Sequence, residues 1–231
     1  NQTNINFTTS AFLDKTPPKV VATTIVNGDS NIPTNTQLRV LFDEPISAAS
    51  AKQLTITQND IAILVKRSIE DDGHVLMVSP VVPLTANTSY KLHIGVVSDL
   101  SGNLLQQVQS IDFSTGSSYD IVAGSLDQLV PIRSQTRVPL NVQILAKVSE
   151  RMDLASATNR TLLLRDSNGS EVNGEFTASA DRFTLKFIPA KPLNANHVYT
   201  VYYNYFHKLN DLAGNRFSDS QNESVFSFTT G

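Results

Sequence analysis

The sequence predicts an all-β protein made of two tandem β-sandwich domains. Three observations lead to this expectation: short apolar runs alternate with polar residues, turn-forming clusters separate these runs, and several sequence blocks occur twice in the same order. Short strands punctuated in this way are typical of sandwiches and barrels.

The composition is that of a folded chain without thiol chemistry. Its 231 residues are 40% hydrophobic and 17% charged, which is enough apolar material for a core. The absence of cysteine excludes a disulfide scaffold, a zinc site with thiolate ligands and a cysteine nucleophile. A net charge of −3 without a dense run of Lys and Arg argues against nucleic acid as the main partner. No apolar run approaches the roughly 18 residues that cross a bilayer. Without a signal peptide or an initial methionine, we expect a processed chain or an excised fragment.

The expected strands are the runs in which every second residue is apolar, such as 38–42, 54–57 and 90–94. Side chains alternate between the two faces of a strand, so these runs describe strands with one face over a core. Clusters that combine Gly with Asn, Asp or Ser separate the runs and suit tight turns. They lie at 27–30, 71–73, 101–103, 168–170 and 212–215.

An internal repeat divides the chain into two domains. Four pairs of blocks correspond: 32–35 with 138–141, 83–90 with 192–199, 99–103 with 211–215, and 113–116 with 228–231. The offsets of about 106 to 115 residues match the size of one sandwich domain. We therefore place domain 1 at 14–116 and domain 2 at 119–231, joined by a short linker at 116–118. Residues 1–13, rich in Asn and Thr, form an N-terminal arm.

Domain 1 resembles a known family through motifs that follow one another along the chain. These are Thr16-Pro17-Pro18-Lys19-Val20-Val21, Val40-Leu41-Phe42-Asp43-Glu44-Pro45-Ile46, Pro83-Leu84, and the blocks at 99–103 and 113–116. On them, the domain is similar to the SbsA-type Ig-like family of bacterial S-layer and cell-surface proteins. Domain 2 keeps the later motifs, but it has no Pro-Pro opening, and Ser149-Glu150-Arg151-Met152 replaces Asp43-Glu44-Pro45-Ile46.

The resemblance implies two tandem Ig-like or fibronectin-III-like sandwiches that act as a non-catalytic spacer or assembly module. It places the chain in a bacterial cell-surface or secreted protein, at an extracellular, cell-surface or periplasmic location. The implied partners are neighbouring domains of a larger parent chain, with a surface polysaccharide or another protein as further candidates.

Two tyrosines occupy equivalent positions in the repeat. Leu84 and Tyr90 are six residues apart, as are Leu193 and Tyr199. This spacing is similar to the tyrosine corner of sandwich domains, in which a buried tyrosine hydroxyl bonds nearby backbone. We interpret Tyr90 and Tyr199 as structural corners, and a binding role for them is the alternative.

An aromatic cluster near residue 200 supports the alternative function, a carbohydrate-binding or adhesive module. Tyr202, Tyr203, Tyr205 and Phe206 lie on one expected strand, and an exposed aromatic row there would stack on sugar rings. The favoured interpretation is core packing on one face of this strand and a contact at the domain junction on the other.

The sequence shows no catalytic constellation, so we expect no enzyme. The four histidines, at 74, 93, 197 and 207, have no metal-binding spacing, and a nucleophile elbow and a phosphate-binding loop are both missing. A hydrolase would need carboxylates converging on one cleft, which nothing in the sequence singles out. The Asp-x-x-Gly-Asn blocks are interpreted as turns. We expect no cofactor, and a calcium ion between the domains is kept as an alternative because its ligands are carboxylate and amide oxygens.

Overall fold

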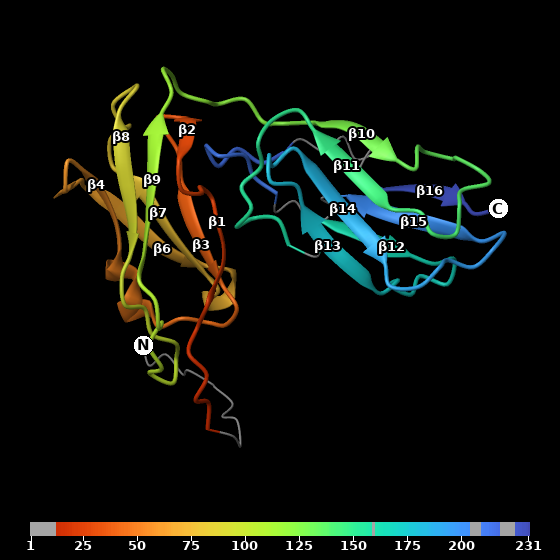
Figure 1. Cartoon of the computed structure of the whole chain (residues 1–231), viewed down its shortest axis with the longest axis horizontal. Helices are drawn as coiled ribbons and strands as arrows, with labels where there is room; N and C mark the ends of the chain where they lie inside the picture. Colours follow the sequence, from red (N-terminus) through yellow and green to blue (C-terminus); the bar gives the residue numbers. More distant parts are fainter. Residues whose placement is uncertain (1–12, 159, 204–208, 218–224) are drawn as a thin grey trace, which may run out of the picture.

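A computed structural model describes residues 13–158, 160–203, 209–217 and 225–231 of the chain. Strands β1–β9 form domain 1, and strands β10–β16 form domain 2, so the predicted all-β tandem sandwich is confirmed. Figure 1 shows the two domains as separate layered bodies, with one end of domain 2 against the side of domain 1. In the described part of the chain, no helix is long and apolar enough to cross a membrane.

Domain 1 consists of two sheets packed face to face. The first has the order β1 (Val20–Thr23), β3 (Leu38–Phe42), β7 (Val75–Pro80) and β6 (Val65–Glu70). The second has the order β2 (Asp29–Ile32), β9 (Gln109–Thr115), β8 (Ser89–Ile94), β4 (Leu54–Gln58) and β5 (Ile61–Ala62). Two short 3-10 turns, η1 (Ala48–Gln53) and η2 (Asp71–Gly73), complete the domain.

Domain 2 repeats this plan. One sheet has the order β10 (Leu126–Val130), β11 (Ile144–Val148), β14 (Thr184–Pro189) and β13 (Gly174–Ala178). The other has the order β12 (Leu162–Arg165), β15 (Val198–Tyr203) and β16 (Val225–Thr229). The parallel pairing of β2 with β9 also has its counterpart, the bridge between Val138 and Thr230.

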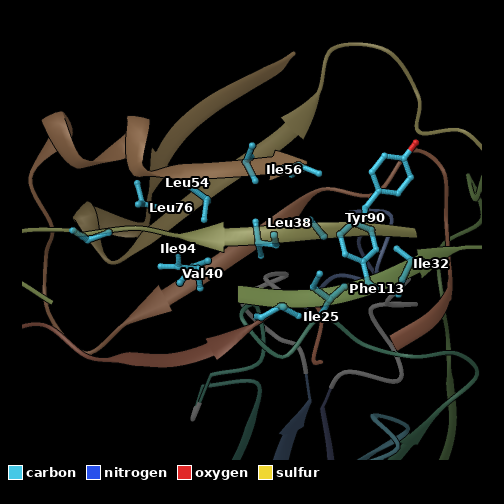
Figure 2. Packing of buried hydrophobic residues seen from close by; sticks show 14 of the residues in the cluster. Ile25, Ile32, Leu38, Val40, Leu54, Ile56, Leu76, Tyr90, Ile94 and Phe113 are labelled. Carbon is cyan, nitrogen blue, oxygen red and sulfur yellow. The ribbon is translucent and has the colours of Figure 1, made fainter. Parts of the chain in front are cut away.

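Each domain has its own core, built by the alternation seen in the sequence. Along β8 every second residue is buried, and the same holds along β15. Figure 2 shows Tyr90 beside Phe113 in the core of domain 1, and their ring centroids are 5.7 Å apart. The one member of this core that domain 2 supplies is Leu212, in the cluster formed by the described residues. The two cores therefore meet at a junction.

Candidate functional site

The junction between the domains starts at the linker, where an amide side chain holds the first residues of domain 2. The Asn35 side-chain nitrogen donates to the Asp120 carbonyl over 2.7 Å, and the Asp120 amide donates to the Asn35 side-chain oxygen over 3.0 Å. This two-way bond fixes the chain direction as it enters domain 2.

Two arginines of domain 2 bind the β2 edge of domain 1. Arg182 is 2% exposed and donates to the Thr24 carbonyl over 2.7 Å and to Asp29 Oδ1 over 2.5 Å. Arg151 donates to the Ser30 carbonyl over 2.9 Å and lies 3.6 Å from Asp29 Oδ1. Charge-assisted bonds of this kind are about twice as strong as neutral ones. Asp29 therefore acts as a shared anchor for domain 2.

A buried ion pair crosses the junction beside these arginines. Arg39 Nη1 of β3 lies 3.3 Å from Asp153 Oδ2, and Asp153 is fully buried. Burial raises the pKa of Asp153 to about 6, because the loss of hydration outweighs the attraction of Arg39. The carboxyl is still ionised above that pH, so the pair exists at neutral pH. Arg39 also lies 3.4 Å from Glu70, at the edge of the junction.

An apolar contact completes the junction. Leu212 of domain 2 is 4% exposed and packs in the core cluster of domain 1. The Thr36 hydroxyl donates to the Leu212 carbonyl over 2.6 Å. Two residues further, Gly214 has a φ of +91°, which favours glycine, and a Cβ added there would lie 2.8 Å from the Gln37 side chain. The junction thus combines a buried leucine, close backbone packing and buried charge pairs.

Two polar cavities lie along the junction. The larger, of about 410 Å³, is lined from both domains by residues that include Arg39, Glu70, Ser156 and Arg216. The smaller, of about 240 Å³, has Asn31 on one side and Asp120 with Glu150 on the other. Among the described residues that line them, neither cavity brings a nucleophile and a base together in the way that a hydrolase requires.

Two groups of three carboxylates occupy equivalent places in the two domains. They are Asp14, Glu44 and Asp99 in domain 1, and Asp120, Glu150 and Asp211 in domain 2. Within each group, one carboxylate oxygen of every residue lies within 4.8 Å of the others. Oxygens so arranged are of the type that holds a divalent cation such as calcium. Asp14, Glu44 and Asp99 lie far apart in the sequence, and only the fold brings them together.

The Asp-x-x-Gly-Asn blocks form turns in both domains. Asp99 Oδ1 accepts the amides of Ser101 and Asn103, each over 2.8 Å. Asp211 Oδ1 accepts the amide of Ala213 over 2.8 Å and that of Asn215 over 2.9 Å. Both aspartates are buried, and their Oδ2 atoms accept the side-chain amides of Asn103 over 2.7 Å and Asn215 over 2.9 Å. The two turns therefore have the same geometry.

The two corner tyrosines also have equivalent surroundings. The Tyr90 hydroxyl accepts the Thr85 amide over 2.9 Å, and the Tyr199 hydroxyl accepts the Asn194 amide over 2.9 Å. Tyr90 is 5% exposed and Tyr199 is 3% exposed, so neither ring is available to a ligand.

Comparison with known families identifies the fold. The bacterial Ig-like domain family matches residues 14–115 and again residues 120–230. The chain belongs to this family. No curated protein matches the sequence.

Solved structures with similar folds are distant from this Ig-like domain pair. The N-terminal part of the bacterial S-layer protein SbsC has 12% identity and a TM-score of 0.34, with 91% of this chain and 44% of that one covered. CopC from Methylosinus trichosporium OB3b has 13% identity and a TM-score of 0.36, over 46% of this chain and 99% of that one. The BSP domain of a biofilm associated protein has 15% identity and a TM-score of 0.26, over 92% and 29%. This chain therefore spans less than half of the SbsC fragment.

In the described part of the aromatic segment of domain 2, Tyr202 and Tyr203 do not form an exposed row of the kind that the carbohydrate alternative needs. Tyr203 is 1% exposed and belongs to the core of domain 2, because alternation along β15 points it inward with Val201 and Tyr199. Tyr202 is half-buried, and the Arg165 guanidinium lies 5.0 Å from its ring centroid. The prediction that Tyr203 contributes to a ligand-binding surface is therefore wrong, because its ring is buried. Tyr205 and Phe206 lie outside the described residues.

Removing the corner hydroxyls tests their structural role. We expect Tyr90→Phe and Tyr199→Phe each to lower the free energy of unfolding by about 1–3 kcal/mol, since each leaves a partly buried amide without its acceptor. The two sites lie in different domains, so the losses should add in the double variant. Urea unfolding followed by circular dichroism measures them. An unchanged free energy of unfolding in both single variants would show that the hydroxyls do not stabilise the fold.

The acidic group of domain 2 makes stability depend on pH. Burial, together with Asp211 and Asp120, raises the pKa of Glu150 to about 7. The folded state then binds a proton that the unfolded state has released, so this contribution to stability is complete below about pH 4.5 and is lost as the pH rises through about 7. We expect Glu150→Gln to be more stable than the unsubstituted chain above pH 7 and equally stable below about pH 4.5. Thermal unfolding across this pH range measures the difference. A constant difference at every pH would contradict the assigned cause.

Proposed function

We propose that this bacterial Ig-like domain pair is a non-catalytic spacer that holds the ends of a cell-surface or secreted protein at a fixed separation. It would act outside the cytoplasm, between neighbouring domains of a larger parent chain. The observation that carries the proposal is the junction. Arg39, Arg182 and Leu212 bind across it while buried, and such contacts are lost if the domains turn relative to each other.

The short linker also supports a stiff junction. Residues 116–118 connect the domains, and both ends of this segment bond to domain 1, since the Ser118 carbonyl accepts the Thr34 amide over 3.2 Å. The Gly116 amide donates to the Ile32 carbonyl over 2.8 Å, and Asn35 holds Asp120 from the other side. Flexible tethers need a longer solvated segment. A spacer requires this combination of short linker and buried junction, whereas a ligand-binding module requires an accessible platform.

Small-angle X-ray scattering of the full chain in calcium and in chelator tests the spacer. We expect a single shape in both solutions, because side chains and backbone of the two domains hold the junction together. The Asp153→Ala, Leu212→Ala double variant is the matched control, and it should give a broad distribution of shapes. A broad distribution of shapes for the chain without substitutions would overturn the proposal. Collapse on chelation would also contradict it, since calcium would then hold the domains.

A further inference from the structure

Two leucines at equivalent positions of the repeat have opposite surroundings. Leu212 and Leu100 both follow the aspartate of an Asp-x-x-Gly-Asn turn, and the two turns have the same hydrogen bonds. Leu212 is 4% exposed because it packs against domain 1, whereas Leu100 is 74% exposed. Leu100 lies in the loop between β8 and β9. Figure 1 draws this loop at the end of domain 1 that is opposite the linker to domain 2. Domain 1 thus presents the apolar part of the junction a second time, and none of the described residues covers it.

The close-approach glycine of the junction is repeated in the same way. Gly214 lies against Gln37, but a Cβ on the equivalent Gly102 would meet open space. Gln143 of domain 2 is the counterpart of Gln37 and is exposed. The register supports this equivalence, because β1 pairs Thr23 with Val40 where β10 pairs Leu129 with Ala146.

The amide clamp is repeated as well. Asn35 holds the backbone of Asp120 at the internal junction. Its counterpart Asn141 is exposed, and Asp14 is the counterpart of Asp120. The Asn103 side chain donates to the Asp14 carbonyl as the Asn215 side chain donates to that of Asp120. The chain therefore carries the two partners of a second clamp, Asn141 on domain 2 and Asp14 on domain 1.

We define two surfaces from these counterparts. The proximal face of domain 1 consists of Asp14, Pro45, Ser47, Gly73, Leu100 and Gly102. The distal face of domain 2 consists of Gln135, Arg137, Asn141, Gln143 and Leu145. Backbone bonds fix the correspondence, since the Ile46 amide donates to the Gly73 carbonyl as the Met152 amide donates to that of Arg182.

Neither face carries the counterparts of the charges that are buried at the internal junction. On the proximal face, Pro45, Ser47 and Gly73 stand where Arg151, Asp153 and Arg182 stand in domain 2. On the distal face, Gln135 and Leu145 stand where Asp29 and Arg39 stand in domain 1. If either face docked on the internal partner of the other, buried charges would be left unpaired, which is strongly destabilising. Placed against each other, the two faces leave none.

One charge pair would be gained. Asn31 lines the smaller junction cavity opposite Asp120 and Glu150, and Arg137 is the counterpart of Asn31 on the distal face. The counterparts of Asp120 and Glu150 are Asp14 and Glu44, which belong to the acidic group of domain 1. A distal face seated on a proximal face would therefore bring an arginine to this acidic group.

We propose that the distal face of one copy of this chain docks on the proximal face of a second copy, head to tail, with Leu100 as the buried contact. This rests on the proposed spacer function and extends it to assembly. The two faces differ, so each added copy leaves one of each uncovered, and the contact generates open linear chains.

Sedimentation velocity of the full chain over a concentration series up to about 1 mM tests the proposal, since contacts made within one chain act at effective concentrations of this order. We expect the average mass to rise continuously past that of a dimer, and to fall again in high salt because Arg137 contributes. A chain that stays monomeric throughout would overturn self-docking and leave the spacer proposal standing. A plateau at the dimer would overturn it too.

Variants on the two faces sharpen the test. Leu100→Asp and Arg137→Glu should each abolish the rise in mass, and Leu64→Asp is the matched control because Leu64 is also 74% exposed. Melting curves confirm that each variant folds. When Leu100→Asp is mixed with the unsubstituted chain, it should shorten the assemblies. Its distal face still docks on an unsubstituted copy, but its own proximal face cannot accept the next copy, so growth ends there. Association that survives Leu100→Asp, or that Leu64→Asp abolishes equally, would contradict the assignment.

Discussion

Replacing Asp153 with alanine is expected to lower the free energy of unfolding by about 3–5 kcal/mol at pH 8, the range for breaking a buried ion pair from one side. Arg39 is 8% exposed, so its positive charge would stay buried in the junction, with Glu70 and Gln37 as its remaining side-chain partners among the described residues. The carboxyl is ionised at this pH, because its raised pKa is about 6. Urea unfolding measures the loss.

The double variant Arg39→Met, Asp153→Leu separates the pair from its surroundings. It removes both charges and keeps side chains of similar bulk, so we expect it to be more stable than Asp153→Ala alone. A double-mutant cycle completed with the single variants Arg39→Met and Asp153→Leu then gives the coupling energy of the pair across the junction. A coupling of zero would show that the pair contributes nothing to holding the domains together.

Replacing Leu212 with alanine is expected to cost about 2–5 kcal/mol, the range for truncating a buried leucine. The leucine is carried by domain 2 but is 4% exposed within the core of domain 1, so its loss would weaken both the core and the junction. Urea unfolding measures the cost, and hydrogen exchange at the Thr36 and Gln37 amides should rise as the junction opens more often.

Leu100→Ala is the matched control for this variant. The same residue type stands in the same turn, but its exposure of 74% limits the expected change to about 0.5 kcal/mol for the chain at low concentration. Equal losses in the two variants would mean that turn formation, and not burial across the junction, accounts for the effect of Leu212.

The sequence by itself determined the class and the repeat. Alternation in runs such as 38–42 places every second side chain on the core face, because strand side chains alternate between faces, and the structure has β3 there. The repeated blocks located both Asp-x-x-Gly-Asn turns, since a turn depends on a few adjacent residues. Both corner tyrosines were also recognised from short-range spacing.

Only the tertiary structure shows which residues of the two domains contact each other. Arg39 and Asp153 are 114 residues apart, and Arg182 and Asp29 are 153 apart, so no local pattern indicates that they meet. Leu100 and Leu212 are the same residue in the same turn, and only the docking of domain 2 buries one and leaves the other exposed. The inward orientation of Tyr203 was fixed likewise by which face of β15 packs on the core. Burial depends on which surfaces come together, and that is settled by long-range packing.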